Sequence, residues 1–468
     1  MMTKYKIPFF ATLAATLLLS ACVTKKYERP ATIKADDVFR DLKNTDTVTM
    51  AKMPWESLFA DAKLKALISK GLAQNADLKN AIENIVQAQA TLRQAKLAYY
   101  PTLSANADIT HNKQALAALN FPPGINIRTL TSVYRAYLST SWEADVWGKL
   151  SASKRMALAN YLQTDAAKRA VQTQLIADIA NTYYNLIALD EQLKITEQTV
   201  QSRIKNIEIV SALKEAAIVN GAAVVQAEAN RYEAEVTIPD LMQSIRETEN
   251  ALNILLSQPP GPIDRSQFEG QIVPENLAIG VSAQLLENRP DVQQAEFNLR
   301  YAFENVNLAK TYFYPSLTLT ANGGASTLHL ENFFKQSLFY SVIGSLTQPI
   351  FNRGLNKQRL TTAQSQQVQA LNTFQQTIYV AGQEVSNALY SYDMAAQKRQ
   401  TRARQIESLT KAVDYTEQLL AYTSTTNYTD VLTSQQSLLA AQLNGINDQL
   451  QQLQAVVELY RALGGGWQ

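Results

Sequence analysis

The residue best placed for covalent chemistry is Cys22, the single cysteine among 468 residues. It follows Leu19-Ser20-Ala21, and Lys4 and Lys6 precede an apolar run over residues 7–19. A basic start, a short apolar run and small residues before a cysteine are typical of a lipoprotein signal peptide. We therefore expect cleavage after residue 21, lipidation of Cys22 and a location in a cell envelope that has a periplasm.

Catalytic chemistry is poorly supported elsewhere in the chain. The two histidines, His111 and His329, fall near predicted strand ends or external loops and far from any nucleophile motif. One cysteine and two histidines are too few for a His/Cys metal cluster. Gly464-Gly465-Gly466 has no strand before it, so it is not a phosphate-binding loop. The sequence predicts no enzyme, no cofactor and no metal.

Composition limits the partners. Lys and Arg number 43 and Asp and Glu number 41, which gives a net charge of +2. So balanced a chain does not suggest a nucleic-acid partner. No run after the signal peptide reaches the roughly 18 apolar residues of a membrane-spanning helix.

A 27-residue pattern occurs twice, 214 positions apart, and indicates two similar halves. Each copy begins with an amphipathic helical period and changes after Tyr-Pro to strict alternation, which is the mark of a helix followed by a strand. The shared residues are Asp77, Ala81, Asn84, Ala88, Ala95, Lys96, Tyr100, Pro101 and Leu103, and Asp291, Ala295, Asn298, Ala302, Ala309, Lys310, Tyr314, Pro315 and Leu317.

The helical part of each copy predicts a heptad seam. Leu78, Ile85 and Leu92 recur every seven residues with alanines between them, and the second copy repeats this arrangement. Large residues that alternate with alanine allow neighbouring helices to approach closely. On periodicity alone an ordinary helical bundle remains equally possible.

The alternating parts predict two β-hairpins, at residues 102–145 and 316–349. Strands of roughly 9–11 residues with one apolar and one polar face match the strands of transmembrane β-barrels. Aromatic residues at the strand ends suggest a membrane-interface girdle. These residues are Tyr100, Trp142, Trp147, Tyr314 and Phe351.

Four strands cannot close a barrel, and open sheet edges are not tolerated in hydrocarbon. Several chains must therefore share one barrel, and three chains would supply twelve strands, an even number within the usual range. The helical periodicity also predicts two long helical hairpins between the strands, with tips near residues 220 and 427. A helix of ~68 residues would extend ~100 Å, which suits the crossing of a compartment. Pro239 should kink the first return helix.

The whole mature chain resembles the TolC family of outer-membrane efflux proteins, in its lipidated OprM-like (NodT) branch. The segments that carry the resemblance keep the family's order and spacing. They are Tyr27–Pro30, Trp55 with Phe59–Asp61, Asn288–Asp291 with Ala295-Glu296, Tyr314–Leu317, Pro349–Phe351 and Leu459–Trp467.

The resemblance implies a mixed α and β membrane protein. Its fold would be a homotrimeric 12-stranded outer-membrane β-barrel, with four strands per chain, continued by a long periplasmic α-helical barrel with an equatorial belt. The expected organisation is a signal peptide (1–21), an N-terminal extension and equatorial segment (22–61), a first repeat (62–255), an equatorial linker (256–288), a second repeat (289–463) and a tail (464–468).

The implied function is that of the outer-membrane channel of a tripartite efflux pump, a passive exit duct for drugs and toxic compounds. The implied partners are two further copies of the chain, outer-membrane lipid, a periplasmic adaptor protein and an inner-membrane transporter of the resistance-nodulation-division type. A type I protein-secretion duct and a non-channel trimeric coiled-coil lipoprotein scaffold are the alternatives.

The resemblance also suggests a gate at the tip of the second hairpin, where the family carries acidic and apolar rings. Asp430 matches an acidic position found in some members. Thr433 replaces a second acidic residue, Gln436 the usual Arg and Thr429 the usual Leu. We therefore expect a gate that depends on Asp430 and on hydrogen bonds, although such an Asp can also be an exposed helix cap. Ala223 stands at the equivalent place in the first hairpin, which we expect to face outward.

Overall fold

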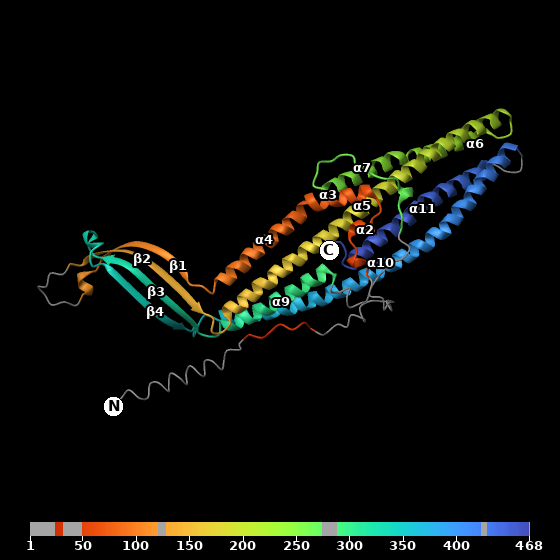
Figure 1. Cartoon of the computed structure of the whole chain (residues 1–468). Coiled ribbons are helices and arrows are strands. Elements are labelled where there is room, and N and C mark those ends of the chain that lie inside the picture. The colour runs from red at the N-terminus through yellow and green to blue at the C-terminus, as the bar shows by residue number, and fades with distance from the viewer. Residues whose placement is uncertain (1–23, 31–48, 120–127, 274–287, 423–427, 468) are drawn as a thin grey trace. The chain divides into compact units, whose positions relative to one another are not determined.

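A computed structural model describes residues 24–30, 49–119, 128–273, 288–422 and 428–467. The signal peptide, Cys22, the second hairpin tip near residue 427, and parts of the predicted N-terminal extension and equatorial linker lie outside these residues. Helices dominate the remainder, together with one four-stranded sheet (Figure 1).

The sheet is antiparallel and its strands follow chain order. Strands β1 (Thr102–Lys113) and β2 (Leu130–Ala144) form the first hairpin. Strands β3 (Ser316–Thr327) and β4 (Leu338–Thr347) form the second, and β2 pairs with β3 to join them. Short 3-10 turns, η3 (Leu116–Ala118) and η5 (Leu330–Asn332), lie between the strands of each hairpin.

Both copies of the repeated pattern form a helix of 22 residues before their strand. These helices are α4 (Ala76–Leu97) and α9 (Pro290–Thr311). The predicted seam is buried in each of them: Ala88 is 3% exposed and Ala302 is 6% exposed. Near the strands, Leu92 and Ala95 pack on Ala157, and the second copy packs in the same way on Ala363.

The long helices follow the strands. Helix α5 (Lys149–Glu215) has 67 residues and α10 (Leu355–Tyr422) has 68. Their return partners are α6 (Gly221–Glu235) with α7 (Thr237–Leu255), and α11 (Tyr428–Ala462). The break at Val236 confirms the expected effect of Pro239, because a proline at the third position of α7 cannot donate to the carbonyl of Glu235.

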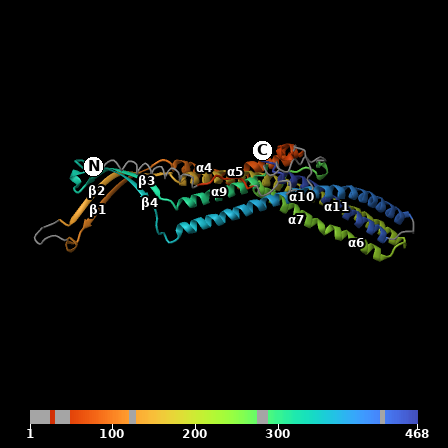
Figure 2. The ribbon, with the colours of Figure 1, turned by 90° about the horizontal axis from the view of Figure 1, so that it is seen from below.

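The chain divides into two compact units. Unit 1 comprises Met1–Arg29, Val86–Gln163 and Ala295–Thr373, and unit 2 comprises Pro30–Ile85, Thr164–Gln294 and Phe374–Gln468. Unit 1 contains the sheet. Unit 2 contains the hairpin ends, in which α10 and α11 run side by side (Figure 2), together with the short elements η2 (Met50–Lys52), α2 (Trp55–Leu58), α3 (Ala62–Gln74) and η4 (Phe268–Gly270).

The core of unit 2 is built from large aliphatic and aromatic side chains. Tyr183 and Leu252 are fully buried, and so are Leu64 and Leu459. Gly71 lies close to this core, where an added Cβ would stand 2.3 Å from Ile179 Cδ1. Hydrogen bonds from Asn75 to the Leu255 carbonyl and from Asn181 to Glu458 join α3 to the end of α7 and α5 to α11.

Candidate functional site: the hairpin tips and the sheet face

The first hairpin tip is a tight reversal between α5 and α6. The Ile218 amide donates to the Leu213 carbonyl at 2.9 Å, and Ala217 has a φ of 57°. This is a Schellman ending with alanine at the position that usually holds glycine. Asn220 then caps α6 by accepting a hydrogen bond from the Ala223 amide. Helix α5 therefore ends at Glu215, five residues before the tip predicted near residue 220.

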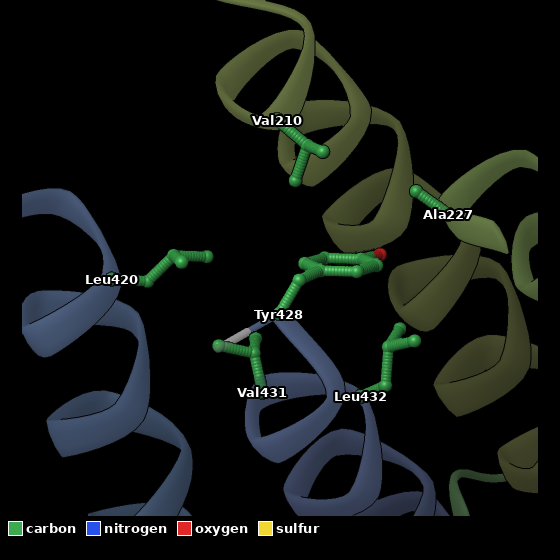
Figure 3. Packing of buried hydrophobic residues seen from close by; sticks show 6 residues of the cluster. All are labelled: Val210, Ala227, Leu420, Tyr428, Val431 and Leu432. Atoms are coloured by element: carbon green, nitrogen blue, oxygen red, sulfur yellow. The ribbon is translucent and has the colours of Figure 1, made fainter. Parts of the chain in front are cut away.

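A hydrophobic cluster joins the ends of both hairpins. Tyr428, the first residue of α11, is buried among side chains from α5, α6 and α10 (Figure 3). Its members are Val210, Ala227, Leu420, Tyr428, Val431 and Leu432. Burial raises the pKa of Tyr428 to about 12, so the phenol is neutral at physiological pH. We call this set the Tyr428 cluster.

A polar contact lies beside the cluster. Arg203 on α5 is buried, donates to the Asn230 carbonyl and lies 4.0 Å from a Glu233 carboxylate oxygen. Burial lowers the pKa of Arg203, against the opposing effects of Glu233 and Tyr428. On the second hairpin, Gln436 Nε2 donates to Glu233 Oε2 at 3.4 Å. Glu233 thus contacts residues of both hairpins.

The predicted gate residues lie on the first turns of α11. Thr429, Asp430, Thr433 and Gln436 are all exposed, and the Thr433 hydroxyl donates to the Thr429 carbonyl at 2.9 Å. Asp430 lies in the first turn, where a negative charge also stabilises the helix dipole. The position of Asp430 is therefore compatible with a role in a gate and with a role as an exposed helix cap.

A groove that is lined in part by Arg203 opens between α5, α6, α7 and α11. Its volume is about 590 Å³. Leu241 and Leu443 supply apolar surface, while Glu233 and Asp240 supply carboxylates. The groove is therefore lined by apolar side chains, carboxylates and the Arg203 side chain.

Asp61, which ends one of the segments that carry the family resemblance, joins distant parts of unit 2. Asp61 accepts hydrogen bonds from Tyr183 (2.6 Å), Ser266 (3.0 Å) and Gln271 (2.9 Å) while it caps α3. Burial alone would raise the pKa of Asp61, but the hydrogen bonds from Tyr183, Gln271, the Lys63 amide and Ser266 together lower it.

A second such centre surrounds Arg289, which is 3% exposed. It pairs with Asp291 and Glu384, both at 2.6 Å, and donates to the Ala462 carbonyl at 2.8 Å. Arg461 pairs with the same Glu384 at 2.9 Å. The motif around Arg289 carries part of the family resemblance, but its local spacing does not encode these distant partners.

The sheet has one continuous apolar face. The register sets Leu103, Leu138 and Leu319 on that face, and Ser104, Ser139 and Asn322 on the other. Leu338 is 88% exposed and Leu103 is 73% exposed. The same face carries Ala105, Ala107, Ile109, Tyr134, Ala136, Trp142, Leu317, Ala321, Tyr340, Val342 and Leu346.

The predicted interface aromatics gather at one end of this sheet. Trp147 stacks on Tyr314 with ring centroids 5.0 Å apart and donates to the Pro315 carbonyl at 2.7 Å. Trp142 donates to the Tyr99 carbonyl at 2.9 Å. Tyr100 is 69% exposed and Phe351 is 84% exposed. Their contact with lipid stays a prediction.

Within the described ranges, no three His, Cys, Asp or Glu side chains gather so that they could hold a metal ion. His111 Nδ1 lies 2.7 Å from the Ser132 hydroxyl, and His329 precedes η5. In the same ranges, no helix is both long and apolar enough to cross a membrane.

Two β-hairpins that share one sheet with an exposed apolar face, each followed by a helix of almost seventy residues, are typical of outer-membrane efflux channels. The sequence model of the family described as outer membrane efflux protein matches residues 67–258 and 281–465. The chain belongs to this family. It is an outer-membrane protein that serves as the exit duct of an efflux pump, and the predicted fold class and family are confirmed.

Similar proteins agree with this assignment. The chain is 29% identical over 477 residues to the probable outer membrane lipoprotein SilC of Salmonella typhimurium, covering 100% of each chain. It is 29% identical over 482 residues to the solvent efflux pump outer membrane protein SrpC of Pseudomonas putida, covering 99% of each. The solved outer-membrane channel OprN has a TM-score of 0.85 at 23% identity, covering 95% of this chain and 100% of that one.

Proposed function

We propose that three copies of the chain close one twelve-stranded β-barrel and one helical duct through which small toxic compounds leave the cell. The observation that carries this proposal is the continuous apolar face of the sheet. In the described part of the chain, β1 and β4 each pair with a single strand. Hydrocarbon does not tolerate such open edges, so β1 of one copy must pair with β4 of the next.

The helices of unit 2 support the closure of a helical duct by three copies of the chain. Helix α5 contacts α11 through Gln192 and Asn447, and α11 contacts α10 through Asp448 and Arg402. Helix α11 thus contacts both α5 and α10, and it also contacts α6 through Gln436 and Glu233. Equivalent head-to-tail contacts between copies form a closed ring.

The transported compounds and the partners follow from the family and from the names of relatives. Relatives named for efflux of solvent, toluene and antibiotics favour small organic compounds as cargo. A passive duct needs an energised inner-membrane transporter, for which we propose the resistance-nodulation-division type, and a periplasmic adaptor protein that joins the two. Lipidation of Cys22 would add a second attachment to the outer membrane.

Protein secretion remains the second duct function, and the names of relatives favour efflux over it. A non-channel coiled-coil scaffold fits less well, because a scaffold has no use for a sheet with a large exposed apolar face. An exposed face of this kind is costly in water and favourable in lipid.

We further propose that the hairpin tips form the gate. Rings of Asp430 would carry the charge, with Thr429 and Thr433 beside them. The Tyr428 cluster and the contact between Gln436 and Glu233 would hold the second hairpin against the first in the closed state. Opening would require these contacts to separate, because they join α11 to α5 and α6 at this end.

The test of the duct is to reconstitute the purified protein in planar bilayers and to measure conductance alongside its migration on gels with and without heating. We expect discrete channels and a trimer that dissociates only on heating. In cells, deletion of the gene should raise intracellular accumulation of an organic dye, and expression of the intact chain should restore export. A stable trimer without conductance in any variant would favour the scaffold.

A further inference from the structure

In unit 1, the segment that follows Cys22 is bound by one buried side-chain amide. Asn307 Nδ2 donates to the Lys25 carbonyl at 2.9 Å, and the Lys25 amide donates to Asn307 Oδ1 at 3.2 Å. One asparagine thus satisfies both main-chain groups of a residue 282 positions away. Asn307 is 1% exposed, so loss of either partner would leave a buried polar group unpaired.

Glu304 fixes the orientation of this amide. Glu304, also 1% exposed, accepts a hydrogen bond from Asn307 Nδ2 at 3.0 Å. The other carboxylate oxygen of Glu304 accepts from Arg155 Nε at 2.9 Å. The ion pair between α5 and α9 therefore holds Asn307 with its Nδ2 and Oδ1 directed at Lys25.

Further contacts extend along the same segment. The Tyr27 ring packs edge-on against Phe303, with centroids 5.6 Å apart, and Arg29 pairs with Glu296 at 3.3 Å. At the other end, Thr24 lies against Gly148, where a Cβ would stand 3.3 Å from Thr24 Cγ2 and where φ is +76°. Gly148 lies between the end of β2 and the start of α5.

Only the second copy of the repeated helix carries these residues. The positions in α4 that correspond to Asn307, Glu304, Phe303 and Glu296 are Arg93, Ala90, Gln89 and Ile82. Neither Ala90 nor Ile82 can form an ion pair, and Ile82 is 45% exposed. Because the two copies share their buried seam, the differences at these four positions point to a task that only α9 performs.

We propose that Asn307, Glu304, Phe303, Glu296 and Gly148 form an anchor clamp, which holds the lipid-bearing N-terminus at the end of the sheet so that anchor and sheet enter the membrane as one unit. The inference rests on the proposed lipidation of Cys22 and on the proposed barrel. Two residues of chain reach about 7 Å at most. A clamp on Thr24 and Lys25 therefore limits how far an acyl group on Cys22 can lie from the end of β2.

Protease protection tests whether the clamp holds the segment in the intact protein. Trypsin should cleave detergent-solubilised wild-type trimers slowly after Lys25 and Lys26, and Asn307→Leu should raise that rate at least tenfold. Arg93→Leu, at the corresponding position of the first copy, is the matched control and should be cleaved at the wild-type rate. Equal rates in wild type and Asn307→Leu would overturn the clamp.

A second pair of variants lies on the segment itself and leaves α9 unchanged. The Tyr27 hydroxyl has no hydrogen-bond partner among the described residues, so Tyr27→Phe should keep the protection. Tyr27→Ala loses the ring contact with Phe303 and should be cleaved several-fold faster. Equal protection in the two variants would contradict the role of this contact.

A double-mutant cycle separates positioning of the anchor from simple structural support. After a pulse label, Asn307→Leu should slow the appearance of heat-modifiable trimers several-fold. In a Cys22→Ser background, with a signal peptide that is cleaved without lipidation, it should add no further slowing. Equal slowing in both backgrounds would overturn the coupling to the anchor.

Separate measurements test the lipidation of Cys22 and the barrel, on which the clamp proposal rests. A wild-type chain that incorporates no labelled palmitate would remove the anchor, and absence of heat-modifiable trimers in every variant would remove the barrel. Either result can occur while trypsin still distinguishes wild type from Asn307→Leu. Proteolysis therefore tests the clamp itself, and labelling and trimer formation test its role in anchoring.

Discussion

Asp61 shows how a single carboxylate can organise a junction between distant segments. It accepts hydrogen bonds from Tyr183 on α5 and from Ser266 and Gln271, which lie more than 200 positions further along the chain than Asp61. Hydrogen bonds to an ionised acceptor are stronger than those to a neutral one. The charge of Asp61 is therefore part of what joins the linker after α7 to α3 and α5.

Asp61→Asn should lower the free energy of unfolding of unit 2 by about 1–2 kcal/mol at pH 7. The folded-state pKa of Asp61 is lowered, so its stabilising effect is present above the unfolded pKa of about 3.9 and is lost as pH falls through the folded pKa. Urea unfolding at pH 7 and at pH 3 should show a gap between wild type and variant that narrows in acid. Asp77→Asn, at an exposed first-turn position, should show no comparable gap.

Asp430→Ala should lower cation selectivity and remove block by multivalent cations in single-channel recordings. Three copies of Asp430 at one constriction would raise the local negative potential, and Thr433 supplies no second charged ring. The closed state should therefore respond weakly to ionic strength. Unchanged selectivity and block would place the constriction elsewhere in the duct.

The control for this experiment follows from the structure. Ala223 is partly buried against the Tyr428 cluster, so an aspartate there would disturb packing as well as charge. Ala222 is exposed on the same helix. Ala222→Asp should leave selectivity near the wild-type value if the first hairpin faces outward.

At the scale of elements, the alanine seams allow α4 and α9 to pack closely on their neighbours. Ala88→Phe and Ala302→Phe should each overpack a buried contact and cost roughly 1–3 kcal/mol in every chain. Trimer dissociation on heating should shift to lower temperature in both variants. Gln87→Phe, on an exposed position next to the seam, is the control. Unchanged dissociation temperatures in both alanine variants would show that the seam is not a close contact.

The elements themselves were largely predictable, because periodicity reports local geometry. Leu92 and Ala95 reveal their buried face through spacing alone, and Pro239 reveals a break because it lacks an amide hydrogen. The polar centres were not predictable in this way. Arg289 meets Glu384 and Ala462 only after the chain has folded, and no local spacing encodes that contact.

The sequence itself contains one clue to the anchor clamp. Comparison of the two copies at the same register separates shared seam positions from Asn307 and Glu304, which differ from Arg93 and Ala90. A buried asparagine or glutamate that breaks an internal repeat signals a specific partner, since burial of an unpaired polar group is costly.

At the scale of the whole molecule, the barrel should hold the protein in the membrane even without lipid. Acyl chains alone give limited membrane binding, whereas a closed barrel is retained much more firmly. Cys22→Ser with an independently cleaved signal peptide should therefore resist extraction by alkaline carbonate. Recovery of this variant as a soluble periplasmic monomer would contradict the barrel.

The internal repeat also bears on ancestry. Each half of the chain contributes two strands, so a protein made of a single half would need six identical subunits to supply twelve strands. Duplication and fusion would halve the number of chains that must meet and would free the two copies to diverge. Asn307 and its neighbours are the kind of divergence that only the fused chain permits: a ring of six identical subunits would carry six clamps or none, whereas three fused chains carry three.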